Sequence, residues 1–332
     1  MRVTGLVEAF DAILSDLDGV VYAGPSAIPG ATEALSALAG RGVGLAYVTN
    51  NASRSPEQVA AHLRELGAPA TPEQVVTSPQ AAARLLAERI PAGSRVLITG
   101  SEALADEVRS AGLEPVWSAA EEPVAVVQGF DPGLGWKDLA EASYAVAAGI
   151  LWVATNTDLS IPQARGIAPG NGTLVAAVRA ATGAEPLVAG KPEVPLFHAA
   201  AARLGASHPA VVGDRLDTDI LGGNRAGYAT ILVLTGVNTA RDALNALTLE
   251  RPTHLIADLG ALYEPYPETV HDDGVWRVGE ASAAVDGNVV TVTAVEDSLD
   301  GWRAACAAWW AAHPDEDTAT SPELLWARRA GS

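Results

Sequence analysis

The segment Ile13-Leu14-Ser15-Asp16-Leu17-Asp18-Gly19-Val20-Val21-Tyr22 joins an apolar run to two aspartates and a glycine. The apolar run predicts a buried strand, and Gly19 permits a sharp backbone turn directly after the acids. Residues two apart in an extended segment project to the same side, so Asp16 and Asp18 could share one cation and one substrate. Because such crowding is unfavourable unless a positive charge offsets it, the segment predicts a functional site.

Two other interpretations of this aspartate pair compete with a functional site. Aspartate commonly ends a strand and stabilises a turn, which would give Asp16 and Asp18 no chemical role. An EF-hand calcium loop starting at Asp16 is excluded, because Val20 and Ala27 would occupy its fifth and twelfth positions. The choice between a turn and a catalytic site therefore depends on the rest of the chain.

Composition limits the class of protein. The 332 residues, 48% of them hydrophobic, suffice for two domains with ample cores. The formal net charge of -19 argues against a nucleic-acid or membrane surface, so an anionic substrate would need a local cation. The single cysteine, Cys306, excludes an internal disulfide framework and fits a reducing compartment. Because no signal peptide or long apolar span is visible, we expect a cytoplasmic protein.

Strand-like and helix-like segments alternate along the chain, which predicts parallel sheets covered by helices. A helix over 29–41 follows the aspartates, and another opens near Ser55. A second alternation, from about residue 79 to residue 187, is interpreted as an inserted domain. Strands are predicted, in chain order, at 44–49, 95–99, 124–130, 151–154, 210–212, 230–234 and 253–257.

Polar residues follow one of these strands and occupy a later turn. Thr49-Asn50-Asn51 ends the strand at 44–49, where ligands of open α/β sheets gather and free amides bind anions; a capped turn is the alternative. Lys191 is one of only two lysines and lies in the turn Gly190-Lys191-Pro192. Pro192 excludes a Walker A motif. Lys191 could neutralise phosphate as a point charge or could be an ordinary surface residue.

Further acids follow the strand predicted at 210–212. Asp214 and Asp219 are hard oxygen donors of the kind that magnesium takes together with waters. We expect Asp217 to cap the helix that follows. The loop at 155–158, continued through 162–172, could line a substrate pocket or could be a plain connection.

In this order, the motifs resemble the haloacid dehalogenase superfamily of phosphatases. Within it the chain is similar to the NagD, p-nitrophenylphosphatase and phosphoglycolate or glycerol 3-phosphate phosphatase group. The resemblance covers about residues 10–262 and includes Thr155-Asn156, the glycines at 170–172 and Thr235-Gly236-Val237. It implies an α/β fold with a Rossmann-like core over 1–79 and 188–262 and an inserted α/β cap of the C2 type over 80–187.

The resemblance also implies a chemical role for each motif. Asp16 would attack phosphorus and become an aspartyl-phosphate, while Asp18 would protonate the leaving alcohol and later activate water. The implied site residues are the Mg²⁺ ligands Asp16, Asp18 (through its carbonyl) and Asp214, the outer-shell Asp219, the phosphate-binding Thr49, Asn50 and Lys191, and the cap specificity residues Asn156, Asp158 and Arg165.

The implied reaction is hydrolysis of a small phosphomonoester, with Mg²⁺ as cofactor and no nucleic-acid or membrane partner. Segments 213–220 and 163–172 look closest to the phosphoglycolate and glycerol 3-phosphate members, and glycerol 3-phosphate is the expected substrate. Phosphoglycolate, nucleotides and sugar phosphates are alternatives. A non-catalytic phosphate-ligand sensor with a partner-binding tail is an alternative of another class, against which the intact Asp16, Asp18, Lys191 and Asp214 argue.

The segment from Glu264 onward departs from the family. It holds thirteen acids, four arginines and five of the eight tryptophans, so it is not a simple disordered acidic tail. A hairpin is predicted from 276–283 and 289–295, with a helix over 302–312. We expect a small α+β extension over 263–332 that packs on the core or mediates a homodimer, with 314–332 loose in part. The histidines match no motif, and Cys306 is expected to be packed rather than reactive.

Overall fold

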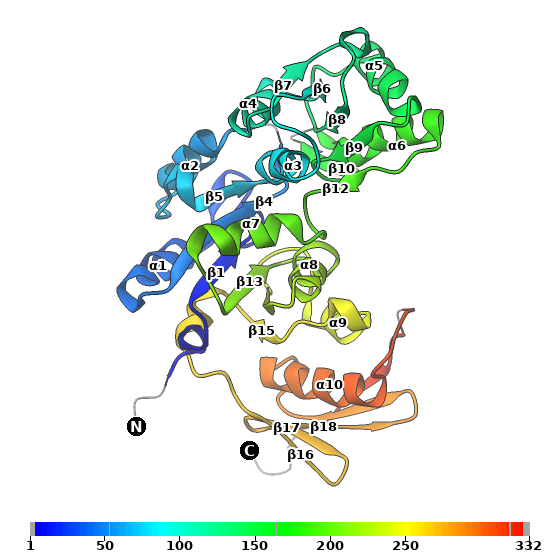
Figure 1. Ribbon diagram of the computed structural model, residues 1–332. Coiled ribbons are helices and arrows are strands. Elements are labelled where there is room, and N and C mark those ends of the chain that lie inside the picture. Colours follow the sequence, from blue (N-terminus) through cyan, green and yellow to red (C-terminus); the bar gives the residue numbers. More distant parts are fainter. Residues whose placement is uncertain (1–3, 53, 164, 319, 328–332) are drawn as a thin grey trace. The chain divides into compact units, whose positions relative to one another are not determined.

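A computed structural model describes residues 4–52, 54–163, 165–318 and 320–327 (Figure 1). The chain divides into two units, which are described separately. Unit 1 takes its described residues from 1–45, 66–69 and 204–332, and unit 2 takes them from 46–65 and 70–203. Within these described ranges, no helix combines the length and the apolar character that a membrane crossing requires.

Unit 1 contains parallel strands that pair in the order β15, β14, β13, β1. Every residue of β1 and β13 is buried, as expected for strands covered on both faces. Their carboxyl ends lie side by side, so the residues that follow them meet at one edge of the sheet. The bounds in this part of unit 1 are β1 (Ala12–Ser15), β2 (Tyr22–Ala23), β3 (Ser26–Ala27), α1 (Ala31–Ala37), β13 (Pro209–Gly213), α8 (Leu221–Arg225), β14 (Ala229–Val233), α9 (Ala240–Leu244) and β15 (His254–Ile256).

Unit 2 contains a second parallel sheet, in the order β12, β9, β8, β6, β7, and a parallel pair formed by β4 and β5. The predicted α/β class with parallel sheets is therefore confirmed. Strands β6 and β9 have the predicted bounds. The elements are β4 (Gly44–Thr49), α2 (Pro56–Glu65), β5 (Val75–Thr77), α3 (Ser78–Ala87), β6 (Arg95–Thr99), α4 (Glu102–Ser110), β7 (Glu114–Val116), β8 (Ala125–Gln128), α5 (Trp136–Ala147), β9 (Leu151–Ala154), β10 (Ser160–Gln163), β11 (Gly166–Pro169), α6 (Asn171–Thr182), β12 (Leu187–Val188) and α7 (Pro195–Leu204).

The C-terminal segment of unit 1 forms a five-stranded sheet in the order β16, β17, β18, β19, β20. Its elements are β16 (Thr269–Asp272), β17 (Val275–Val278), β18 (Ala281–Asp286), β19 (Val289–Thr293), α10 (Leu299–Ala312) and β20 (Glu323–Ala327). The prediction of one strand over 276–283 is wrong, because Gly279, at φ 56°, turns the chain between β17 and β18. Within the segment predicted to be loose in part, β20 pairs in parallel with β19, and 328–332 lie outside the described residues.

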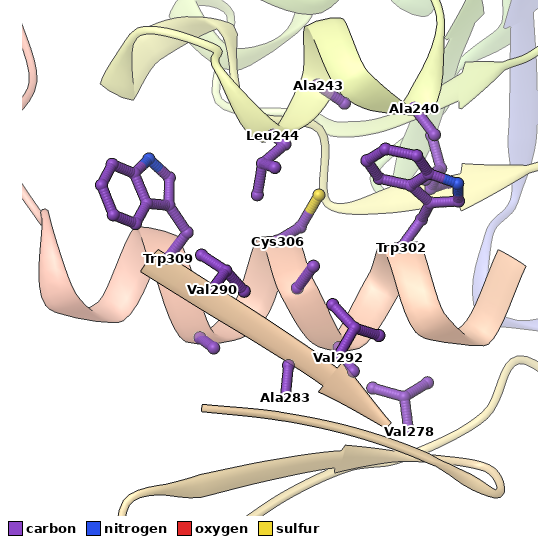
Figure 2. Close-up of a cluster of buried hydrophobic side chains, with 14 of the residues drawn as sticks. Ala240, Ala243, Leu244, Val278, Ala283, Val290, Val292, Trp302, Cys306 and Trp309 are labelled. Atoms are coloured by element: carbon purple, nitrogen blue, oxygen red, sulfur yellow. The ribbon is translucent and has the colours of Figure 1, made fainter. Parts of the chain in front are cut away.

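Helix α10 lies between this sheet and α9, and side chains from all three elements form one hydrophobic cluster (Figure 2). The labelled members are Trp302, Cys306 and Trp309 from α10, Ala240, Ala243 and Leu244 from α9, and Val278, Ala283, Val290 and Val292 from the sheet. Cys306 is buried within this cluster, so the prediction that it is packed is confirmed. Burial raises the pKa of its thiol to about 12, which disfavours the reactive thiolate.

Two side chains from the C-terminal segment bind the backbone of β15, the last strand in the order of unit 1's parallel sheet. The Leu255 amide donates to the Tyr266 hydroxyl at 3.0 Å. Arg303 donates from Nε and Nη2 to the Leu255 carbonyl at 3.0 and 2.7 Å. Both backbone groups of Leu255 are thus satisfied by side chains, which protects the edge of the sheet.

We expect protein stability to depend on pH because of His254, the residue before Leu255 in β15. It packs edge-on against Phe10 and Tyr266, with ring centroids 5.9 and 4.6 Å away. Burial, with a smaller contribution from Arg303, lowers its pKa from 6.5 to about 4. The unfolded chain therefore takes up the proton first as the pH falls, so stability present above pH 6.5 is lost between pH 6.5 and about 4.

A His254→Gln variant removes this titration. It should reduce the drop in unfolding free energy between about pH 7 and about pH 5 by roughly 1–2 kcal/mol, measured by urea denaturation at both pH values. His271→Gln, at an exposed position, is the control and should leave that drop unchanged within about 0.5 kcal/mol. Equal pH dependence in wild type and His254→Gln would contradict the prediction.

Candidate active site

Carboxylates from two loops of unit 1 converge at the carboxyl ends of β1 and β13. One oxygen each from Asp16, Asp214 and Asp219 lies within 4.8 Å of the others. Asp214 is 2% exposed and Asp219 is fully buried. Buried carboxylates at this spacing repel one another unless a cation lies among them, and hard oxygen donors suit Mg²⁺. The residues present therefore fit a divalent metal ion.

The two aspartates of the N-terminal motif have different surroundings. The Asp16 amide donates to the Val212 carbonyl at 2.8 Å, which extends the β1–β13 pairing and places Asp16 beside the second acidic loop. Among the described residues, the acidic group at this edge does not include the Asp18 carboxylate, which is exposed and accepts from the Tyr22 hydroxyl at 3.3 Å. Asp16 therefore belongs to the carboxylate group that fits a metal ion, whereas the Asp18 side chain lies outside that group.

Glycines and a backbone amide enclose the Asp214 carboxylate. The Val237 amide donates to its Oδ2 at 2.7 Å. A Cβ atom on Gly19 would lie 2.2 Å from Oδ2, and one on Gly236 would lie 2.0 Å from it. Gly19 also has φ 77°, a left-handed conformation that glycine adopts readily. Both glycines are therefore required by the close approach of Asp214.

Asp219 lies in a short π-helix over Leu216–Ile220. Its Oδ2 accepts from the Arg215 amide at 3.3 Å, and a Cβ on Gly213 would lie 2.2 Å from the Asp219 Cβ. The prediction that Asp217 caps the helix is wrong. Asp217 lies inside the π-helix, where it binds the Arg215 guanidinium through contacts of 3.1 and 2.8 Å. Arg215, two residues earlier, offers the Asp217 carboxylate a charged partner, whereas a helix cap would pair that carboxylate only with backbone amides.

In unit 2, Asn50 connects the end of β4 to the Gly190-Lys191 turn. Its Nδ2 donates to the Lys191 carbonyl at 3.1 Å, and its Oδ1 accepts from the Lys191 amide at 2.8 Å. Gly190 allows this approach, because a Cβ there would lie 2.4 Å from the Thr155 carbonyl and 2.5 Å from Asn50 Oδ1. Lys191 is 5% exposed and Thr49 is 6% exposed. The structure therefore brings Asn50 and Lys191 together, while Thr49 precedes Asn50 in the chain and its hydroxyl accepts from the Asn51 amide at 3.1 Å.

The loop after β9 joins the same network. Asn156 is 4% exposed, donates to the Asn50 carbonyl at 2.8 Å and accepts from the Asp158 amide at 3.2 Å. The Asp158 carboxylate accepts from Asn50 Nδ2 at 3.2 and 3.3 Å. Arg165 lies in an exposed turn between β10 and β11. Asn156 thus holds the loop in place, and Asp158 lies next to the residue that binds the Lys191 backbone.

Comparison with known proteins identifies the family. A haloacid dehalogenase-like hydrolase model matches residues 13–114, and a HAD-hydrolase-like model matches residues 188–262. The chain is 47% identical over 312 residues to D-glycerol 3-phosphate phosphatase of Mycobacterium tuberculosis, which covers 92% of this chain and 88% of that protein. The chain belongs to the haloacid dehalogenase-like hydrolases.

Other members of this hydrolase family are also similar to the chain. An acid sugar phosphatase of Staphylococcus aureus is 40% identical over 255 residues, covering 76% of this chain and 96% of that protein. The crystal structure of glycerol phosphate phosphatase from Mycobacterium tuberculosis in complex with magnesium has a TM-score of 0.86 at 44% identity, covering 99% and 96% of the two chains. p-Nitrophenyl phosphatase from Archaeoglobus fulgidus has a TM-score of 0.70 at 32% identity, covering 76% and 98%.

Sequence reasoning missed several contacts in this haloacid dehalogenase-like hydrolase. It gave Tyr22 no role, although the Tyr22 hydroxyl binds the Asp18 carboxylate. It included Thr235-Gly236-Val237 in the family resemblance without a task, whereas Val237 and Gly236 contact Asp214. The sequence did offer one indication of this role, because Thr235-Gly236-Val237 comes just after β14, a strand of the same parallel sheet.

Proposed function

We propose that this hydrolase is a magnesium-dependent phosphatase that cleaves a small phosphomonoester through an aspartyl-phosphate, with glycerol 3-phosphate as its substrate. The observation that carries the proposal is the separation of the two motif acids. Asp16 lies in a group of carboxylates suited to Mg²⁺, whereas the Asp18 carboxylate lies outside it. The relative named D-glycerol 3-phosphate phosphatase and the related structure with magnesium support the substrate and the metal.

The residues that would hold Mg²⁺ are Asp16, Asp214 and the backbone carbonyl of Asp18, with Asp219 behind them. When bound, the ion would offset the negative charge of these carboxylates and draw electron density from a phosphoryl oxygen. Asp16 would then remain ionised and nucleophilic while it faces an anionic substrate. The Asp18 side chain would stay available for proton transfer.

The proposed reaction has two chemical steps. An Asp16 oxygen forms a bond to phosphorus as the bond from phosphorus to the ester oxygen breaks, and Asp18 gives its proton to the departing alkoxide. Asp18 then takes a proton from a water molecule, which attacks the phosphorus of the aspartyl-phosphate. Inorganic phosphate leaves and Asp16 is restored as a carboxylate. Two smaller barriers thus replace one direct attack by water.

The phosphoryl oxygens would be bound by residues of unit 2. The Lys191 ammonium supplies a positive charge, and the Thr49 hydroxyl and the Asn50 amide supply hydrogen-bond donors. Phosphoryl transfer depends mainly on such positioning and charge stabilisation. We further propose that residues 80–187 form the cap that selects the substrate, through Asn156, Asp158 and Arg165, and that the enzyme works in the cytoplasm.

A sugar phosphate is the second candidate substrate, because the staphylococcal relatives are named acid sugar phosphatases. The test is phosphate release from glycerol 3-phosphate, phosphoglycolate, a nucleoside monophosphate and a hexose phosphate, each with magnesium or with EDTA. We expect metal-dependent turnover with the highest kcat/KM for glycerol 3-phosphate. A higher kcat/KM for another ester would overturn the substrate, and equal turnover in EDTA would overturn the role of magnesium.

A Gly190→Ala variant is expected to weaken phosphate binding. The new methyl group would meet the Thr155 carbonyl at 2.4 Å and Asn50 Oδ1 at 2.5 Å, which must displace the Lys191 backbone. Since misplacement of a positioning group by about 1 Å can reduce the rate 100-fold, we expect kcat/KM to fall by about 10- to 100-fold. Steady-state kinetics and calorimetry with inorganic phosphate would measure the loss.

The matched control for this change is Gly135→Ala at the start of α5. Gly135 has φ -126°, and the nearest atom to its added Cβ is Asp138 Oδ2 at 3.9 Å. That variant should keep kcat/KM within about twofold, because surface substitutions of this kind have small effects. If both alanine variants behave alike, the proposed part of the Asn50 contact in phosphate binding is wrong.

A further inference from the structure

We propose that Thr235 is a positioning residue for the proposed Mg²⁺ ligands, and that its loop, residues 235–238, holds the two acidic loops in register. The inference rests on the proposed function, because it concerns the same magnesium site. It assigns a task to a loop that supplies none of the proposed metal ligands. The loop follows β14, which pairs with β13 in unit 1.

Thr235 acts on the turn that carries Asp18. Its hydroxyl donates to the Gly19 carbonyl at 2.6 Å, while the Gly19 amide donates to the Tyr22 carbonyl at 2.8 Å. Gly19 is therefore held at both its amide and its carbonyl, in a left-handed conformation with φ 77°. The Asp18 carbonyl shares a planar peptide with the Gly19 amide, which the Tyr22 carbonyl holds. The Thr235 bond holds the next peptide and so limits rotation of the backbone about Gly19.

The same loop also holds the second acidic segment. The Val237 amide donates to Asp214 Oδ2 at 2.7 Å, and the Asn238 amide donates to the Asp214 carbonyl at 3.0 Å. Asn238 Oδ1 accepts from the Leu216 amide at 2.9 Å. The loop thus binds both the side chain and the backbone of Asp214.

The loop consequently connects two ligand-bearing segments that are far apart in sequence. A magnesium site requires its oxygen ligands within a few tenths of an ångström of octahedral positions. Loss of a partner that orients a metal ligand typically reduces metal affinity by about 10- to 100-fold. Without the Thr235 hydroxyl, the turn after β1 would keep the bond from the Gly19 amide to Tyr22 and its close approach to Asp214, but it would lose the hydrogen bond at the Gly19 carbonyl.

The test is a comparison of Thr235→Val with Thr235→Ser. Valine keeps the shape of the side chain and removes the hydroxyl, whereas serine keeps the donor. We expect Thr235→Val to bind Mg²⁺ about 10- to 100-fold more weakly by isothermal titration calorimetry, and its kcat to become half-maximal at correspondingly higher Mg²⁺. Thr235→Ser should stay within about threefold of wild type, because the serine hydroxyl can make the same bond.

The matched control is Thr253→Val, also in unit 1. The Thr253 hydroxyl donates to the Thr230 carbonyl at 2.6 Å, a bond similar to that of Thr235 that joins residues outside both acidic loops. This variant should lower thermal stability in EDTA while its Mg²⁺ affinity stays at the wild-type value. A purely structural role for Thr235 would give the same pattern in Thr235→Val.

The outcomes separate this inference from the proposed function. If wild type binds Mg²⁺ and releases phosphate while Thr235→Val binds Mg²⁺ equally well, only the positioning role is overturned. Equal weakening in Thr235→Val and Thr235→Ser would also overturn it, since the hydroxyl would then not be the decisive group. If wild type neither binds Mg²⁺ nor releases phosphate, the proposed function and this inference are both overturned.

Discussion

An Asp16→Asn variant is expected to release phosphate more slowly than wild type by a factor on the order of 10⁴ or more. The amide that replaces the carboxylate carries no charge and is a poor nucleophile towards phosphorus. The substitution also removes one of the three carboxylates whose oxygens lie within 4.8 Å of one another, so magnesium binding should weaken as well. Phosphate release under saturating substrate and magnesium would measure the rate. Acid quenching followed by mass spectrometry should detect a phosphorylated Asp16 only in wild type.

Asp217→Asn is the matched control for this variant. It also removes one negative charge near the site, but Asp217 binds the Arg215 guanidinium and lies outside the carboxylate group. We expect its kcat to remain within about twofold of wild type, because exposed ion pairs contribute little. Undiminished turnover in Asp16→Asn would sink the covalent mechanism and leave direct attack by water as the alternative.

A Trp309→Ala variant is expected to lower the unfolding free energy of unit 1 by about 3–5 kcal/mol. Trp309 is 2% exposed and belongs to the cluster that joins α9, α10 and the C-terminal sheet. Removal of the indole leaves a cavity between elements that come from distant parts of the sequence, and the surrounding side chains can relax only in part. Urea denaturation followed by far-ultraviolet circular dichroism would measure the loss.

Trp136→Ala provides the control in unit 2. Trp136 is 77% exposed, so its truncation should change the unfolding free energy by less than about 0.5 kcal/mol. Similar transitions for the two tryptophan variants would show that the α10 cluster does not hold the C-terminal sheet in place.

Local sequence patterns predicted the longer strands of both parallel sheets but missed β7 and β12, which are only three and two residues long. The continuous apolar runs at β6 and β9 gave their bounds, because strands buried on both faces leave a strong local signal. The C-terminal sheet was predicted less completely. Parallel pairing of β20 with β19 joins segments separated by α10, and no local pattern specifies such a partner. The turn at Gly279 was missed because Glu280 beside it is not a typical turn residue.

The candidate site was likewise predicted only in part: its acidic residues were selected from the sequence, but the contacts between its loops were not. Sequence order selected Asp16, Asp214 and Asp219, because each follows a strand of one parallel sheet. The hydrogen bond from Thr235 to Gly19 depends on how separate loops meet, and spacing along the chain carries no information about it. The failed prediction for Asp217 has a related cause. A cap is a local preference, and the nearby Arg215 fork outweighed it.

The side chains that protect β15 also set an order of events during synthesis. The ribosome completes β15 before it makes Tyr266, and it reaches Arg303 later still. Until both side chains have been made, the backbone of Leu255 lacks partners from the extension. A released chain that stops before Tyr266 would therefore leave this strand edge open, and it should aggregate more readily than the full chain.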